Sequence, residues 1–81
     1  MEPIEVTVRY DLHGKTYPQQ FVWDGQVFPV TSTGRRWQDV AGLHVLVMTA
    51  DMKTYELVFD TLELRWYLDH ASLRSKIALS T

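Results

Sequence analysis

The residues best suited to chemistry in this sequence are arginines interleaved with aromatic rings. The stretch "GRRWQ" brings Arg35, Arg36 and Trp37 together, and Arg9, Arg65 and Tyr67 lie on the polar faces of expected strands. Guanidinium groups bind phosphates and flat rings stack on bases, so this set suits single-stranded nucleic acid. The same residue types dominate the hot spots of protein interfaces. A third interpretation is structural, with Trp37 closing the end of a barrel and the arginines solvated.

A second motif, "HGKT" at 13–16, contains the Gly-Lys-Thr end of a phosphate-binding loop. The full motif needs a glycine five residues before Gly14, where the chain has Arg9, and a helix afterwards, where the chain has Pro18. The helix N-terminus that would hold the phosphate is therefore missing. We interpret 13–16 as an ordinary turn.

Metal and catalytic motifs are not found. The three histidines, His13, His44 and His70, show no metal-ligand spacing such as i, i+4. His44 lies in an apolar stretch, where we expect a histidine whose hydrogen bonds are satisfied within a sheet. No nucleophile elbow occurs, and most aspartates fall at expected turns, where they bond the local backbone. We therefore expect no catalytic residue, no metal, no cofactor and no small-molecule substrate.

The elements that must position these residues are short strands. Residues 4–12 alternate apolar and polar side chains with Ile4, Val6, Val8, Tyr10 and Leu12 on one face, as in a half-buried strand. The stretch "FVWDGQVFPV" at 21–30 predicts a hairpin at Asp24-Gly25, because both central residues of a type I′ turn need positive φ. The bulky residues spaced for cross-strand packing over a core are Phe21, Trp23, Phe28 and Val30. Pro18 and Pro29 cannot donate to a ladder, so they mark strand edges, ends or bulges.

The second half of the chain predicts three more strands. Residues 32–42 are polar and predict a loop containing at most one helical turn. Residues 43–50 are apolar on both faces apart from His44, as in a central strand. Residues 54–60 alternate with Tyr55, Leu57 and Phe59 inward. The face of 62–68 expected to be buried carries Leu62, Leu64, Trp66 and Leu68, which leaves Arg65 and Tyr67 on the other.

The end of the chain changes character. Asp69 is a suitable cap for a short helix carrying Leu73 and Ile77 on one face. So short a helix is marginal alone, so it must dock on the sheet, pair with a partner or fray. We expect one β domain over 1–68 and a tail over 69–81. The fold class is all-β, with five or six antiparallel strands in a strongly bent sheet or a small SH3-like barrel. A two-layer sheet covered by the tail helix is the alternative.

The composition of the chain excludes several classes of function. The 81 residues make one domain, and 46% hydrophobic residues suffice for its core. The net charge is −2, from 8 basic and 10 acidic side chains, so any basic surface for nucleic acid must be local. With no cysteine, disulfides and thiolate chemistry are excluded, which suits the reducing cytoplasm. The start resembles no signal peptide, and the apolar run "LHVLVM" is far shorter than the ~20 residues of a membrane span.

The pattern F-x-W-x-G-x-x-F-x-V over 21–30 resembles the signature hairpin of a short bacterial domain of unknown function. The similarity continues through Arg36-Trp37, a long strand, "YEL" at 55–57, Asp60 and Trp66-x-Leu68, and covers roughly residues 20–68. The link after Trp37 is shorter than in that family. Such domains occur alone or near error-prone Y-family DNA polymerases. The resemblance implies a cytoplasmic accessory domain connected with DNA damage tolerance, and it assigns no catalytic residue.

The sequence as a whole predicts a non-enzymatic interaction module. The first candidate partner is another protein or a second copy of the chain, bound at edges marked by Pro18 and Pro29 or by the tail helix. The alternative partner is nucleic acid, bound by the arginine and aromatic set described above. No membrane partner is expected.

Overall fold

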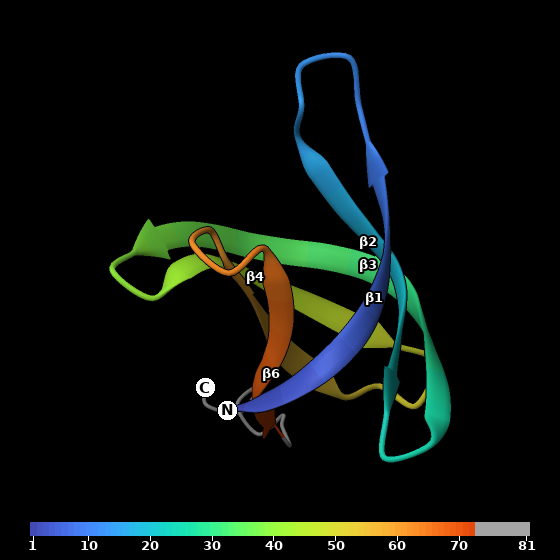
Figure 1. The fold of residues 1–81 in the computed structure, drawn as a ribbon. Coiled ribbons are helices and arrows are strands. Elements are labelled where there is room, and N and C mark those ends of the chain that lie inside the picture. The colour runs from blue at the N-terminus through green and yellow to red at the C-terminus, as the bar shows by residue number, and fades with distance from the viewer. Residues whose placement is uncertain (73–81) are drawn as a thin grey trace.

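The computed structural model describes residues 1–72, which form six antiparallel β-strands with no helix among them. The strands are β1 (Glu2–Tyr10), β2 (Thr16–Trp23), β3 (Gln26–Asp39), β4 (Gly42–Thr49), β5 (Thr54–Asp60) and β6 (Arg65–Ser72). Each strand pairs with its neighbour in sequence, and β1 pairs with β6 to close a barrel (Figure 1). The prediction of an all-β fold with a small SH3-like barrel is confirmed. Within the described part of the chain, no helix is long and apolar enough to cross a membrane.

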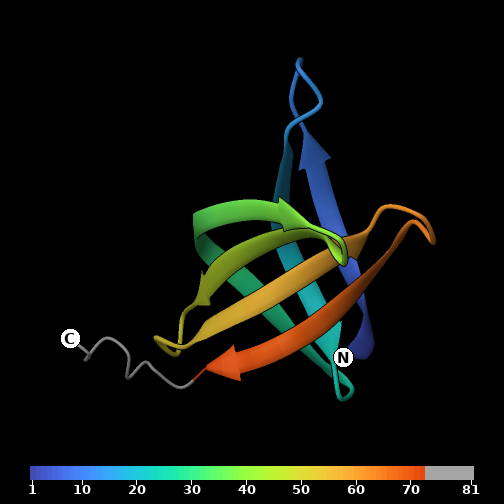
Figure 2. The ribbon, with the colours of Figure 1, turned by 90° about the vertical axis from the view of Figure 1, so that its left-hand side faces the viewer.

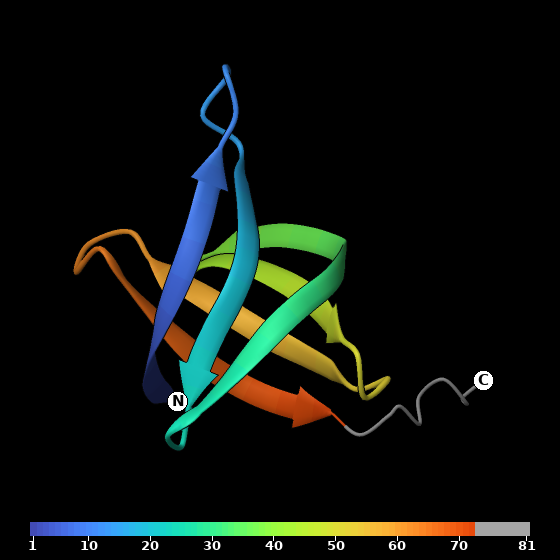
Figure 3. The same ribbon diagram turned by 90° about the vertical axis from the view of Figure 1, so that its right-hand side faces the viewer.

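The β1–β2 hairpin projects beyond the barrel. In Figures 1, 2 and 3 its tip stands well clear of the other strands. Tyr10 and Leu12, expected on the buried face, are 60% and 94% exposed for this reason. The inward alternation of β1 therefore ends at Val8, which is half-buried against the core.

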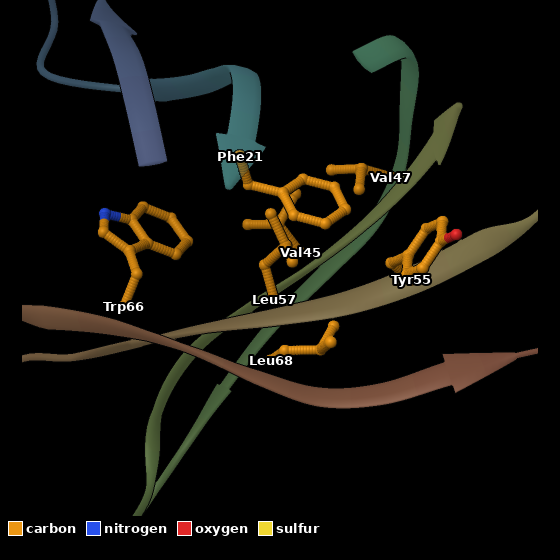
Figure 4. Close-up of a cluster of buried hydrophobic side chains, with 7 residues drawn as sticks. All are labelled: Phe21, Val45, Val47, Tyr55, Leu57, Trp66 and Leu68. Carbon is orange, nitrogen blue, oxygen red and sulfur yellow. The ribbon is translucent and has the colours of Figure 1, made fainter. Parts of the chain in front are cut away.

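The core fills the barrel from both halves of the chain. Figure 4 shows Phe21 at its centre, close to Val45, Val47 and Leu57. The Phe21 ring stacks on Phe28 with centroids 5.0 Å apart. The buried core consists of Phe21, Val45, Val47, Tyr55, Leu57, Trp66 and Leu68.

The hairpin predicted at Asp24-Gly25 is confirmed as a structural one. The two turn residues have φ of 54° and 74°, as a type I′ turn requires. Trp23 packs on Phe28 with centroids 5.9 Å apart, and its indole N–H donates to Glu2 at 2.8 Å.

The loop predicted over residues 32–42 is wrong, because β3 continues as a strand to Asp39. It does so through two register shifts against β4, one between Val30 and Ser32 and one between Thr33 and Arg36. Each shift is a bulge that absorbs extra residues and breaks the alternation by which strands are recognised. Beyond Pro29, which lies opposite Gln20 of β2, the backbone partners of β3 are all on β4. Pro29 therefore marks the point where β3 leaves β2.

The prediction for Pro18 as a bulge marker is confirmed. Pro18 lies opposite Val8, next to the register shift in the β1–β2 ladder, and Gln19 is the extra residue. The β2–β3 ladder ends at Pro29, so the following part of β3 is paired on the β4 side only, and Pro29 stands at the start of a free edge.

The last strand begins and ends later than predicted. The carboxylate of Asp60 accepts the backbone N–H of Leu62 and of Glu63, both at 2.9 Å, and holds residues 61–64 in a turn. Leu62 and Leu64 are therefore 93% and 72% exposed instead of buried. Asp69 lies within β6, so it caps no helix, and the strand continues beyond residue 68 to Ser72. Residues 73–81, the rest of the predicted helix, lie outside the described residues.

Candidate nucleic-acid interface

Three cations surround one tyrosine ring where the projecting hairpin meets the barrel. The guanidinium of Arg9 lies 4.3 Å from the centroid of Tyr17, that of Arg36 lies 5.2 Å away, and the ammonium of Lys15 lies 5.6 Å away. We call these four residues the Tyr17 cluster. Cations are attracted to the face of an aromatic ring at such distances, which offsets part of their mutual repulsion. The ring thus gathers three positive charges in an acidic chain.

The strands explain how the Tyr17 cluster forms. Arg9 and Tyr17 are direct partners in the β1–β2 ladder, so their side chains share a face. Arg36 comes from β3, where it lies opposite the core residue Val45. Its guanidinium reaches the Tyr17 ring beyond the end of the β2–β3 ladder, where these two strands no longer pair. One guanidinium nitrogen, Nη2, is buried and has no acceptor among the described residues.

Asp11 organises the hairpin tip that carries the cluster. Its carboxylate accepts the backbone N–H of His13 at 2.8 Å, the backbone N–H of Lys15 at 2.9 Å and the hydroxyl of Tyr17 at 3.4 Å. The hydrogen bond from the Lys15 backbone, above all, holds the pKa of Asp11 below its ordinary value. These hydrogen bonds therefore hold the loop at the tip together, and they position Lys15 relative to Tyr17.

A second set of rings lies on the outer face of β3–β6. Trp37, His44, Val58 and Tyr67 are successive ladder partners, so they form one row across four strands. We call this row, with the two arginines beside it, the Trp37 face. Arg35 lies 4.9 Å from the Trp37 ring and Arg65 lies 5.9 Å from the Tyr67 ring. The Tyr67 hydroxyl donates to Glu63 at 2.5 Å, and this bond raises the pKa of Tyr67.

His44 is the buried member of the Trp37 face. Only 6% of it is exposed, and its ring stacks on Trp37 with centroids 4.8 Å apart and planes at 12°. Nδ1 lies 2.7 Å from Glu56 Oε2, and Nε2 lies 2.8 Å from Asp39 Oδ1. Both nitrogens face carboxylate oxygens, so both must donate and the ring is an imidazolium. Burial lowers the pKa of His44, but the bonds to Asp39 and Glu56 outweigh it and raise the pKa above its ordinary value.

The surroundings of His44 also include groups that bind metals. Glu56, Asp69 and one ring nitrogen of His44 place ligand atoms within 4.8 Å of one another. No residue spacing signals this set, because its members come from three separate strands. The expectation that His44 has satisfied hydrogen bonds is confirmed.

The predicted binding residues divide between two surfaces. Arg35, Trp37, Arg65 and Tyr67 gather on the Trp37 face, whereas Arg36 points to the other side of β3 and joins the Tyr17 cluster. Trp37 does not close the barrel end, since it packs on the outer face. Sequence reasoning missed Lys15 and Tyr17 as partners of Arg9, although the register of a hairpin turning at 13–14 already places Arg9 near Tyr17.

Most cations of the described residues lie over aromatic rings. Among the described residues, Arg9, Lys15, Arg35, Arg36 and Arg65 each lie over an aromatic ring, and Lys53 alone among lysines and arginines does not. In the same part of the chain, the ion pairs within 4.0 Å involve His44 only. The five cations that lie over rings are therefore positioned by those rings, and none of them makes an ion pair within 4.0 Å in the described part of the chain.

No known protein family, no curated protein and no solved structure matches the chain.

Proposed function

We propose that this barrel is a non-enzymatic domain that binds the phosphate backbone of single-stranded nucleic acid through the Tyr17 cluster. The observation that carries the proposal is the gathering of Arg9, Lys15 and Arg36 around one ring, with no salt bridge within 4.0 Å to any of them among the described residues. Phosphate contacts by uncompensated cations supply most of the affinity of such proteins. The acidic net charge is compatible with this role because the cluster is local.

The arrangement favours a flexible strand over a duplex. The cluster lies on a projecting hairpin and on β3, and its cations are held over the ring of Tyr17. Guanidinium planes held over rings provide stacking surfaces for unpaired bases. The buried Nη2 of Arg36, which has no acceptor among the described residues, is a donor that a phosphate oxygen could satisfy.

The Trp37 face contributes less to this proposal. Arg35 and Arg65 there are accompanied by the acidic side chains of Asp39, Glu56 and Asp69, which repel a polyanion. The sequence-based choice of Trp37 and Tyr67 as base-stacking residues is retained as a secondary contact region. A cytoplasmic location, expected from the sequence, belongs to the same proposal.

The test is fluorescence anisotropy with a labelled oligothymidine of about 12 nucleotides, a length typical of one small barrel. The protein should bind at low salt and more weakly at about 0.15 M salt. The double variant Arg9→Ala/Lys15→Ala removes two cluster charges, so the slope of log affinity against log salt should fall by about 1.4.

Lys53→Ala is the matched control, because Lys53 is the described cation that lies over no ring. It should leave both the affinity and the salt slope unchanged. Absence of binding at low salt, or an equal loss in Lys53→Ala and the double variant, would rule out the Tyr17 cluster as the binding site.

A protein partner is the second candidate, and one observation favours it. From Val30 to Asp39, β3 pairs with β4 on one side and has no β2 partner on the other. A strand from another chain could add to such an edge. A self-associating form predicts a mass that rises from monomer to dimer with concentration in sedimentation equilibrium, independently of salt. A constant monomer mass would remove the homodimer version.

A further inference from the structure

Four consecutive strands bring one imidazole and three carboxylates together on the outer face of the barrel. Asp39 comes from the end of β3, His44 from β4, Glu56 from β5 and Asp69 from β6. The proposed nucleic-acid contacts of the Tyr17 cluster use none of these residues. We call the four residues the His44 cluster.

The His44 cluster carries surplus negative charge. Even with an imidazolium, three carboxylates leave two negative charges uncompensated. No lysine or arginine of the described residues lies within 4.0 Å of these carboxylates, whose ion pairs there are with His44 alone. A bound divalent cation would offset this charge.

The two sides of the His44 ring are not equivalent. In the barrel order β3-β4-β5-β6, Asp39 lies on the β3 side, whereas Glu56 and Asp69 lie on the β5 and β6 side. Asp39 accepts a hydrogen bond from the Nε2–H group of His44 at 2.8 Å. This bond fixes the ring orientation and leaves Nδ1 directed at Glu56. A carboxylate behind a histidine is the usual support of a metal-ligating imidazole, because it orients the ring and raises its basicity.

We infer that the His44 cluster binds a divalent first-row transition ion, with Nδ1 of His44 and the carboxylates of Glu56 and Asp69 as ligands and Asp39 as the support of the imidazole. One nitrogen and two oxygens suit Zn²⁺ and its neighbours in the series better than Mg²⁺ or Ca²⁺, which prefer oxygen alone. A fourth position is left for water or another ligand.

The required adjustment is small. A tetrahedral ion with bonds of about 2.0–2.2 Å separates its ligand atoms by about 3.4 Å. Nδ1 and Glu56 Oε2 are now 2.7 Å apart with a proton between them, and the three ligand atoms lie within 4.8 Å. The ion takes the place of that proton while Asp69, which is exposed, moves inward. The His44 ring itself is held in place by its stacking on Trp37.

The experiment is calorimetric titration of the purified protein with ZnCl₂, together with the visible absorption of the Co²⁺-loaded protein. We expect one equivalent of Zn²⁺ to bind and Co²⁺ to give the absorption of a four-coordinate site. Asp69→Asn removes an exposed ligand without disturbing the core, and it should weaken Zn²⁺ binding at least about tenfold, as should His44→Gln. Asp39→Asn should weaken it about 10–100-fold through the ring orientation.

His13→Gln is the matched control, because His13 is an exposed histidine at the hairpin tip, away from the His44 cluster. It should bind Zn²⁺ as the wild type does. No uptake of Zn²⁺ at millimolar concentration would overturn the inference, and so would unchanged affinity in Asp69→Asn. Equally tight binding of Mg²⁺ that persists in His44→Gln would show that the carboxylates act without the imidazole, which also overturns it. Oligonucleotide binding is measured separately, so failure here leaves the Tyr17 cluster untouched.

Discussion

At the scale of single residues, chemistry and structure depend on a few side chains that the sequence presents as ordinary. Asp11 looks like one more turn aspartate, yet its carboxylate ties together the tip that carries Lys15. His44 looks like a sheet histidine, yet both its nitrogens are engaged by carboxylates. The role of His44 depends on partners from other strands, which no local pattern reveals.

Acid should loosen the hairpin tip through Asp11. Because the pKa of Asp11 is lowered in the folded protein, mainly by the Lys15 backbone N–H, its stabilisation is present above the ordinary pKa and lost as pH falls through the lowered value. The amide NMR signals of His13 and Lys15 should therefore shift with a midpoint below about 3.9. In Asp11→Asn this transition should disappear, and a wild-type midpoint at or above that value would contradict the assignment.

Two glycines offer a matched test of backbone strain. Gly42 has φ of 139°, and a Cβ there would lie 2.1 Å from the carbonyl oxygen of Phe59. Gly14 has φ of 82° and nothing within 4 Å of such a Cβ. Gly42→Ala should cost about 3 kcal/mol or more in unfolding free energy, whereas Gly14→Ala should cost only about 1–2 kcal/mol. Equal urea midpoints for the two variants would contradict the packing at the start of β4.

At the scale of elements, the sequence predicts strands well where one face is buried and poorly where neither is. The type I′ hairpin and the inward residues of β5 follow from turn chemistry and alternation. Residues 32–39 have polar side chains and two bulges, so no period of two is left to recognise. The late start of β6 has a similar cause. Leu62 and Leu64 extend the apolar alternation of Trp66 and Leu68, although they lie in a turn held by hydrogen bonds to Asp60. The predicted site was divided because residues 35–37 lie in a strand and not in a loop: successive side chains alternate faces, so Arg36 points to the core-facing side while Arg35 and Trp37 point outward.

The β2–β3 hairpin should depend on its aromatic packing. Trp23 is half-buried against Phe28 and Tyr55 and bonds to Glu2, so Trp23→Ala should lower the unfolding free energy by about 2–3 kcal/mol. Val27→Ala is the control on the same hairpin, since Val27 is 52% exposed, and it should cost well under 1 kcal/mol. A thermal midpoint of Trp23→Ala within two degrees or so of the wild type would show that this packing contributes little to stability.

At the scale of the whole molecule, the barrel depends on the contact between its first and last strands. The β1–β6 ladder covers only Glu2–Ile4 against Trp66–Leu68, less than any other ladder in the barrel. The net charge is also a property of the whole molecule, and its value of −2 gives no indication of the local basic cluster around Tyr17.

Removing residues 1–4 should therefore open the barrel. The deletion removes the β1–β6 pairs, the Glu2–Trp23 bond and the packing of Ile4, so the unfolding free energy should fall by at least about 2 kcal/mol. Removal of Met1 alone, which lies outside β1 and is 63% exposed, is the control and should change little. Coincident urea unfolding curves for the two shortened chains would show that closure contributes nothing.

The short β1–β6 ladder also has a consequence for synthesis on the ribosome. Strand β1 emerges first, but its partner β6 is complete only when Ser72 has been translated and has left the exit tunnel. Until then β1 and the growing end of the meander each present an unpaired edge to neighbouring chains. The nascent chain therefore passes through an open sheet with unpaired edges. It can aggregate through those edges until the last strand has paired with β1.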